Sequence, residues 1–337
     1  MRSPRCSANR VTRVADSAFF GQDAAWQEWL RSIASERMHH AWLFAGARGL
    51  GKQAFARAAA ARLVGGVDPA DDAAIDSHPD IHVLTPLPAS DDDAKKKAEG
   101  KPYQTKRNIS VDQVREMIRK LATRPTLGDR RAIIVDPADD LEKGAVNALL
   151  KVLEEPPAGT YFILLAHQPG RLLPTVRSRC RVLRFAPLDE AALDTMLRRE
   201  VPEADAPSRQ AAIRAAQGSP GLARTFVSLD LGTIHDLMVR IVERGDGDYV
   251  LRGALAREMG PRPARERQLA AIELARAVLL GCIGETTRRH QLAVIEAHQS
   301  LGQLLVRAPT YNFDPGVLIM DIGGLLASSA MPRDSRT

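Results

Sequence analysis

Short apolar runs and stretches with helical periodicity alternate along the first half of the chain. The apolar runs typical of buried strands lie at 40–45, 132–136, 161–166 and 181–185, and a turn at 77–80 leads into a further candidate strand. The stretches that predict helices between them are 23–36, 53–63, 110–122 and 145–153. Strands that alternate with helices predict a parallel, doubly wound α/β sheet over residues 40–185.

Strand patterns stop after Pro187, and only helical patterns follow. Gly218-Ser219-Pro220-Gly221 breaks the pattern and precedes one more helix. The remaining predicted helices are 189–201, 208–216, 234–243, 249–259, 264–281, 290–306 and 317–328. The second half of the chain is therefore predicted to be all α.

A charged segment at 86–107 interrupts the α/β pattern. Its run of Asp91, Asp92 and Asp93 is followed by the cations Lys95, Lys96, Lys97, Lys101, Lys106 and Arg107. Such a segment offers few apolar groups for a core, so we predict a mobile, solvated insertion. The alternative is a segment that contacts DNA or a protein partner.

A glycine loop ending in lysine follows the first apolar run. Gly46, four residues, and then Gly51-Lys52 match the spacing of a phosphate-binding loop, with Gly49 between them. Backbone N–H groups and the start of the next helix favour an anion there. Gln53 stands where a Ser or Thr hydroxyl would bind Mg²⁺ in a hydrolysing enzyme.

Asp136 ends another buried run, where a parallel strand would place a carboxylate beside the glycine loop. Pro137 follows it, and a proline can neither polarise water nor bind a metal ion. Nucleotide binding by Gly46, Gly49, Gly51, Lys52 and Asp136 is thus predicted to be degenerate, with ATP bound without hydrolysis or not at all.

Composition and charge narrow the function further. The 337 residues suffice for two or three domains, and only three cysteines occur, Cys6, Cys180 and Cys282. Their spacing indicates neither disulfides nor zinc and suggests a reducing cytoplasm. The N-terminal stretch is basic without an apolar signal core, and no run is long enough to span a membrane.

A net charge of +6 permits work close to DNA. The basic residues are scattered, aromatic residues make up only 4%, and no recognition element is evident. A sequence-specific DNA-binding regulator is therefore disfavoured.

Three motifs together resemble the AAA+ subunits of bacterial clamp loaders. They are the glycine loop of residues 46–52, Asn147-Ala-Leu-Leu-Lys-Val-Leu-Glu-Glu-Pro-Pro157, and Ser178-Arg179-Cys180. The resemblance runs in order from Phe20 to about Arg224. It implies an AAA+ P-loop domain at 1–186, a small helical lid at 187–233 and a helical oligomerisation (collar) domain at 234–337.

The departures from the family pattern separate its types. The ATP-hydrolysing gamma or tau type carries a Thr after the loop lysine, Asp-Glu at 136–137 and an arginine after the Gly-Ser of 218–219. This chain has Gln53, Asp136-Pro137 and Gly218-Ser-Pro-Gly221, which resemble the non-motor delta prime type, as does Ser77-His-Pro-Asp80. The four cysteines of the zinc module that many members carry are absent between Leu63 and His78, so no zinc site is expected.

The resemblance also implies a role and partners. Arg179 would be an arginine finger, inserted in trans into the ATP site of a neighbouring motor subunit, with Ser178 and Cys180 positioning its turn. The alternative for Arg179 is a structural salt bridge. The expected partners are the gamma/tau and delta subunits, with the sliding clamp and primed DNA reached through the complex and no membrane. A catalytically active, gamma/tau-like ATPase is the competing hypothesis for the whole chain.

Overall fold

The computed structural model describes residues 21–35, 37–101, 103–282, 288–308 and 313–330. The predicted basic N-terminal tail, Phe20 and the predicted helix end at Glu36 lie outside these residues. The chain divides into two compact units, Met1–Pro187 and Leu188–Thr337. The further division of the second unit into a lid and a collar stays a prediction.

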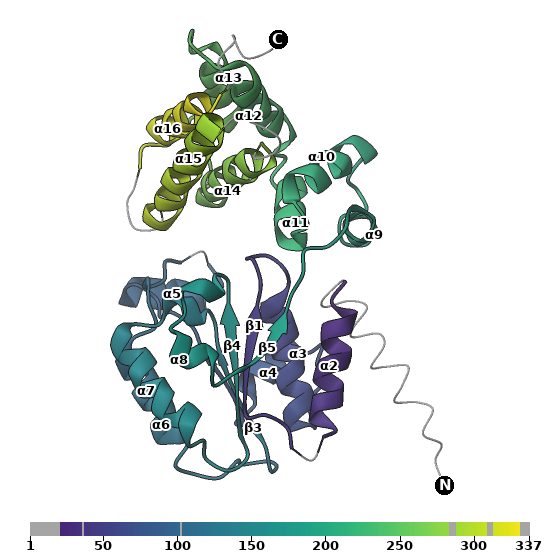
Figure 1. Ribbon diagram of the computed structural model, residues 1–337, viewed down its shortest axis with the longest axis vertical. Coiled ribbons are helices and arrows are strands. Elements are labelled where there is room, and N and C mark those ends of the chain that lie inside the picture. Colours follow the sequence, from purple (N-terminus) through teal and green to yellow (C-terminus); the bar gives the residue numbers. More distant parts are fainter. Residues whose placement is uncertain (1–20, 36, 102, 283–287, 309–312, 331–337) are drawn as a thin grey trace. The chain divides into compact units, whose positions relative to one another are not determined.

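A five-stranded parallel sheet forms the centre of the first unit (Figure 1). Its strands are β1 (Ala41–Ala45), β2 (Ile81–Leu84), β3 (Arg131–Val135), β4 (Thr160–Ala166) and β5 (Arg181–Arg184), in the order β2-β3-β4-β1-β5. Leu43 of β1 lies opposite Leu164 of β4 on one side and Val182 of β5 on the other. The predicted parallel α/β sheet is confirmed.

Three helices cover one face of the sheet: α2 (Asp23–Ile33), α3 (Lys52–Val64) and the short α4 (Asp72–Ser77). Trp29 is fully buried, its ring packs edge-on against Trp42 and Phe44, and its indole N–H donates to the carbonyl of Ala59. Trp26 packs in the same way against Phe55. Edge-to-face aromatic packing adds to the area that these rings bury, so both helical tryptophans are core residues.

The other face carries α6 (Val111–Lys120), α7 (Lys143–Glu154) and the short α8 (Pro174–Arg177). Ser110 and Gln113 form a capping box at the start of α6. Met117 of this helix is buried, whereas Ile118 is only partly buried. Short 3₁₀ turns follow β3 and β4, at Ala138–Asp140 and Pro169–Arg171.

The segment between β2 and α6 corrects one prediction. Residues 91–98, expected within a loop, form the helix α5 (Asp91–Ala98). Ser90 caps it by accepting a hydrogen bond from the Asp93 backbone N–H, and three acids in its first turn and three lysines in its last complement the helix dipole. An N-cap residue, together with acids at the start and lysines at the end, therefore suffices to form a helix that has no apolar face.

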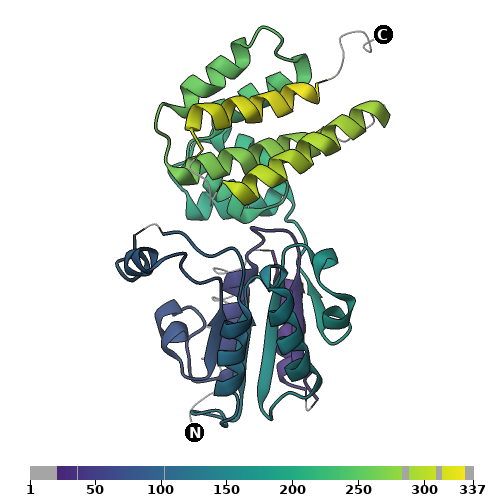
Figure 2. The same ribbon diagram turned by 90° about the vertical axis from the view of Figure 1, so that its left-hand side faces the viewer.

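The regular elements described in the second unit are all helices, as predicted (Figure 2). Its helices are α9 (Glu190–Glu200), α10 (Ala206–Ala216), α11 (Pro220–Ser228), α12 (Gly232–Arg244), α13 (Val250–Met259), α14 (Arg265–Gly281), α15 (Arg288–Arg307) and α16 (Pro315–Ser328). Within the described ranges, no helix is both long enough and apolar enough to cross a membrane.

Candidate functional site

The glycine loop lies between β1 and α3, at the carboxyl ends of the strands. A side chain at Gly46 would place its Cβ 2.6 Å from the carbonyl oxygen of Phe185, so only glycine fits there. Gly49 and Gly51 have φ values of 81° and 78°, in the left-handed region that favours glycine. Gly51 is also the N-cap residue of α3. All three predicted glycines are thus explained by the backbone of the loop.

Lys52 is buried in this loop, with 3% of its surface exposed. Its Nζ donates to the carbonyl oxygens of Gly46 and Ala47, each at 2.7 Å. Burial lowers the pKa of Lys52 to about 8, although Asp136 and Asp139 oppose that shift. In this structure the lysine is therefore engaged by the loop's own backbone.

Two further residues complete the site, Asp139 and His167, which the sequence analysis did not identify. Asp139 accepts hydrogen bonds from the backbone N–H groups of His167 and Gln168. Burial, with Lys52 and Arg48 nearby, lowers the pKa of His167 to about 4, so its imidazole is neutral at pH 7. The signal that could have found it is its position directly after the apolar run of β4.

The sheet order explains why these groups meet. Strands β3, β4 and β1 are neighbours, so Asp136, His167 and the glycine loop follow adjacent strand ends. Burial raises the pKa of Asp136, and the charge of Lys52 partly offsets this rise. One buried oxygen of Asp139 and Nδ1 of His167 have no hydrogen-bond partner within the described part of the chain.

The donor groups of this site fit an anion and do not fit a hydrolytic metal centre. The loop glycines, the start of α3 and Lys52 are groups that bind phosphate. The side chain at the Mg²⁺-binding position is the exposed amide of Gln53, and Pro137 stands beside Asp136. No group of three or more His, Cys, Asp or Glu residues that could hold a metal ion occurs in the described ranges.

Arg179 lies apart from this loop, in the turn between α8 and β5. Its Nη2 is 2.5 Å from Oε1 of Glu154, and its Nη1 donates to the carbonyl of Thr175 at 2.9 Å. The side chains of Arg179 and Glu154 keep 34% and 50% of their surface exposed. The ion pair foreseen as the alternative to an arginine finger is therefore present, and it lies at the surface.

The neighbours of Arg179 fix the turn. Ser178 donates through its hydroxyl to the carbonyl of Thr175. Cys180 packs against the core of its face of the sheet, and burial raises the pKa of its thiol to about 12, so it is no nucleophile at pH 7. A pocket of 440 Å³ lies beside the turn, lined among others by Leu43, Val182 and Arg177.

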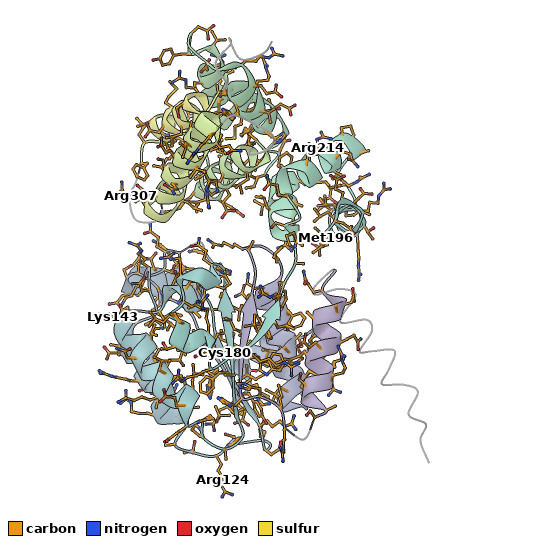
Figure 3. All side chains as sticks on the ribbon, in the orientation of Figure 1. Arg124, Lys143, Cys180, Met196, Arg214 and Arg307 are labelled. Atoms are coloured by element: carbon orange, nitrogen blue, oxygen red, sulfur yellow. The ribbon has the colours of Figure 1, made fainter. Side chains whose placement is uncertain are left out.

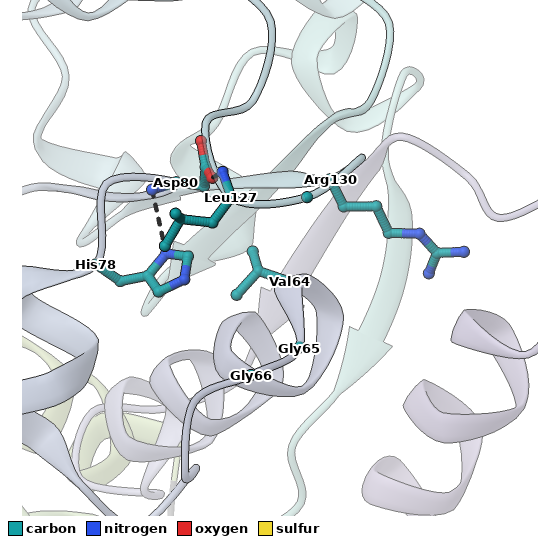
Figure 4. Close-up of a pocket in the computed structure, with 8 residues that line it drawn as sticks. Val64, Gly65, Gly66, His78, Asp80, Leu127 and Arg130 are labelled. Carbon is teal, nitrogen blue, oxygen red and sulfur yellow. Dashed lines mark hydrogen bonds between the residues drawn. The ribbon is translucent and has the colours of Figure 1, made fainter.

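A second pocket lies at the amino end of the sheet, opposite the end that carries the glycine loop. Arg124 marks this amino end in Figure 3. The pocket has a volume of 330 Å³ and is lined among others by Gly65, His78 and Asp80 (Figure 4). Since the glycine loop follows the carboxyl end of β1, this pocket is separate from the glycine loop.

The Gly-Ser-Pro-Gly segment lies in the second unit, where it starts α11. Ser219 caps the helix by accepting a hydrogen bond from the backbone N–H of Leu222, and Pro220 occupies the first turn. Helix initiation therefore accounts for these residues structurally.

Comparison with known proteins gives one consistent family. A family model described as DNA polymerase III, delta subunit, matches residues 21–189. The delta prime subunit of DNA polymerase III from Escherichia coli is 34% identical over 269 residues, which cover 73% of this chain and 75% of that protein. The delta prime subunit from Pseudomonas aeruginosa is 35% identical over 208 residues, and the match spans 58% of each protein.

A relative of the motor type is more distant. The tau/gamma subunit of DNA polymerase III from Haemophilus influenzae is 26% identical over 292 residues, which cover 82% of this chain and 40% of that protein. The nearer relatives are delta prime subunits, and the chain belongs to the delta prime subunit family of bacterial DNA polymerase III.

Proposed function

We propose that this chain is the non-motor delta prime subunit of a DNA polymerase III clamp loader. In this role it assembles with gamma/tau and delta subunits and supports loading of the sliding clamp onto primed DNA. It supplies Arg179 to the ATP site of a neighbouring gamma/tau subunit and catalyses no reaction alone. The names of the relatives support the complex, and the geometry of Arg179 supports the role within it.

The observation that carries the proposal is the exposure of the Arg179–Glu154 ion pair. Exposed ion pairs contribute about 0.2–1 kcal/mol, because water solvates both separated charges. An arginine finger accelerates phosphoryl transfer by about 10³–10⁵, or roughly 4–7 kcal/mol of transition-state stabilisation. Leaving Glu154 therefore costs about 1 kcal/mol or less, whereas the guanidinium fork beside the phosphate oxygens would stabilise the transition state by several kcal/mol.

The chain's own glycine loop has a different role in this proposal. Lys52 and the start of α3 are groups suited to phosphate, while Gln53 and Pro137 replace the side chains that would bind Mg²⁺ and activate water in a hydrolysing enzyme. The chain therefore binds nucleotide without turnover or binds none. Equilibrium binding of labelled ATP to the purified chain, beside a phosphate-release assay, separates these cases. Mg²⁺-dependent phosphate release by the purified chain would instead support the competing gamma/tau-like ATPase.

The decisive experiment compares Arg179→Ala with Arg177→Ala in the reconstituted complex. Arg177 is exposed two residues earlier, so both variants lose one positive charge from the same turn. We expect both complexes to assemble, and only R179A to slow ATP hydrolysis at the site next to this chain and to reduce clamp loading. Equal ATP turnover by the two complexes would refute the arginine-finger role.

A further inference from the structure

Residues 87–107 form a distinct arm of the first unit. Its two ends pair as a short antiparallel ribbon, in which the backbone N–H of Ala89 donates to Gln104 and that of Lys106 donates to Leu87. Helix α5 stands between these ends, and Asp93 ties it to the ribbon by accepting from the backbone N–H of Gln104 at 3.0 Å. In Figures 1 and 2 α5 lies outside the layers formed by the sheet and its covering helices.

The arm adds almost nothing to the core of the unit. Helix α5 contains no buried residue, and the large side chains of Leu87 and Tyr103 are 45% and 39% exposed. A segment that buries so little contributes little to stability through the hydrophobic effect. The arm is nevertheless held by defined hydrogen bonds, so its surface is presented in an ordered form.

The lysines of the arm fall into two groups, those paired with an acidic side chain and those without such a partner in the described part of the chain. The arm carries six cationic and four acidic side chains, a net charge of +2. Lys96 pairs with Asp92 at 2.6 Å and Lys101 pairs with Glu99 at 2.7 Å.

Lys95, Lys97 and Lys106, by contrast, have no acidic partner within the described part of the chain, and Lys97 lies over the ring of Tyr103. The acids start α5 and its lysines end it, so the lysine end is free to approach a polyanion. Tyr103 is the exposed aromatic side chain of the arm, and Nζ of Lys97 lies over one face of its ring, 5.8 Å from the centroid.

We propose that this arm binds the phosphate backbone of double-stranded DNA without regard to base sequence. Lysine is depleted in protein–protein interfaces, whose energetic centres are buried aromatic and arginine side chains, whereas lysine contacts phosphate readily as a point charge. A single tyrosine with a lysine over one face of its ring offers no platform on which successive unpaired bases could stack. The proposal goes beyond the role of Arg179 and does not depend on it.

The test is a salt series of duplex DNA binding by the full chain, read as fluorescence anisotropy of two labelled duplexes of unrelated sequence. Each lysine that contacts a phosphate adds about 0.9 to the magnitude of the slope of log K against log salt. We expect the variant Lys95→Ala/Lys97→Ala/Lys106→Ala to reduce that slope by about 2.7, equally for both sequences. Its thermal stability should equal that of the wild type, because α5 buries no residue.

The matched control is the variant Arg62→Ala/Lys120→Ala/Arg124→Ala. These side chains are exposed, lie near or beyond the carboxyl ends of α3 and α6, and belong to the amino end of the sheet (Arg124 in Figure 3). Both variants lower the net charge from +6 to +3, so the control removes the same bulk charge. We expect the control to keep the wild-type slope.

Three results would overturn the proposal: no duplex binding by the wild type at low salt, equal slopes for the two variants, or loss of subunit assembly by the arm variant with an unchanged slope. The last result would assign the arm to a protein partner.

The two proposals can be tested separately. DNA-independent ATP hydrolysis by the complex should not change in the arm variant, and R179A should keep the wild-type slope of log K against log salt. Failure of one proposal is thereby distinguished from failure of the other.

Discussion

The buried carboxylate of Asp80 is expected to hold together the amino end of the sheet. Asp80 is fully buried directly before β2 and accepts hydrogen bonds from the backbone N–H groups of Thr126 and Leu127, each at 2.7 Å. Its Oδ1 lies 3.6 Å from Nε of Arg131, which is 2% exposed. Figure 4 shows Asp80 beside His78, whose Nδ1 accepts from the Asp80 backbone N–H.

Substitution of Asp80 by Asn removes the charge and one of the two side-chain acceptors. The guanidinium of Arg131 keeps its hydrogen bonds to the carbonyls of Lys120, Thr123 and Arg124 but loses its counter-charge. Leaving one charge of a buried pair uncompensated costs about 3–5 kcal/mol, and a buried N–H without an acceptor adds to that cost. We therefore expect D80N to lower the free energy of unfolding of the first unit by at least about 3 kcal/mol.

Urea unfolding followed by tryptophan fluorescence measures this directly. All three tryptophans, Trp26, Trp29 and Trp42, are buried in the first unit, so the signal reports that unit alone. Asp76→Asn is the matched control, because Asp76 pairs with Arg57 at 2.8 Å while remaining 62% exposed, and an exposed pair contributes less than about 1 kcal/mol. Equal unfolding midpoints for the two variants would refute the reasoning.

The pH dependence provides an independent check on the cause. Burial by itself raises the pKa of Asp80, but the hydrogen bonds from Leu127 and Thr126 and the charge of Arg131 together hold that pKa below its usual value. A lowered folded-state pKa gives stability that is complete above the unfolded-state pKa and is lost as the pH falls through the folded-state pKa. The difference in the free energy of unfolding between the wild type and D80N should therefore become smaller as the pH falls. A constant difference from pH 7 to about pH 3 would contradict this account.

Two further stability predictions use the same fluorescence assay. Because burial lowers the pKa of Lys52 from 10.5 to about 8, the free energy of unfolding of the wild type should rise relative to that of Lys52→Met as the pH rises from 8 to 10.5. A constant difference over this range would show that folding does not lower the pKa of Lys52. Ser110→Ala should cost about 1 kcal/mol, because it removes the capping box of α6. Ser90→Ala, which uncaps α5, should leave the transition unchanged, since α5 packs against no core residue; equal losses from the two serine variants would show that α5 is part of the cooperative unit.

Much of the fold could be predicted because its signals are local. Strands β3 and β4 are apolar runs of buried residues, and the starts of α6 and α11 carry Ser110 and Ser219 as caps. The resemblance to the delta prime type, which rested on short motifs, is confirmed by the comparisons. Helix α5 was missed because its sequence lacks apolar periodicity, although Ser90 was available as a cap. Helix α4 was missed for the same reason, with Asp71 as its cap.

The candidate site was only partly predictable, because its contacts cross the sheet. The spacing of Gly46, Gly51 and Lys52 is visible in the sequence, but the interactions of Asp139 and His167 depend on β4 lying between β1 and β3. Periodicity predicts that strands exist and does not give their order. The pairing of Arg179 with Glu154, 25 residues earlier, likewise depends on how α7 packs beside α8.

The difference between Lys52 and Arg179 shows where this chain can act on another molecule. Lys52 is buried, and two carbonyls of its own loop accept its hydrogen bonds. A phosphate would have to compete with those contacts, and Gln53 stands where a hydroxyl would hold Mg²⁺ with it. To reach a new anion, Arg179 gives up an ion pair at the surface and a hydrogen bond to the carbonyl of Thr175. The group that can exchange partners at least cost in free energy therefore lies at the surface, which supports the proposal that this chain completes a neighbour's site.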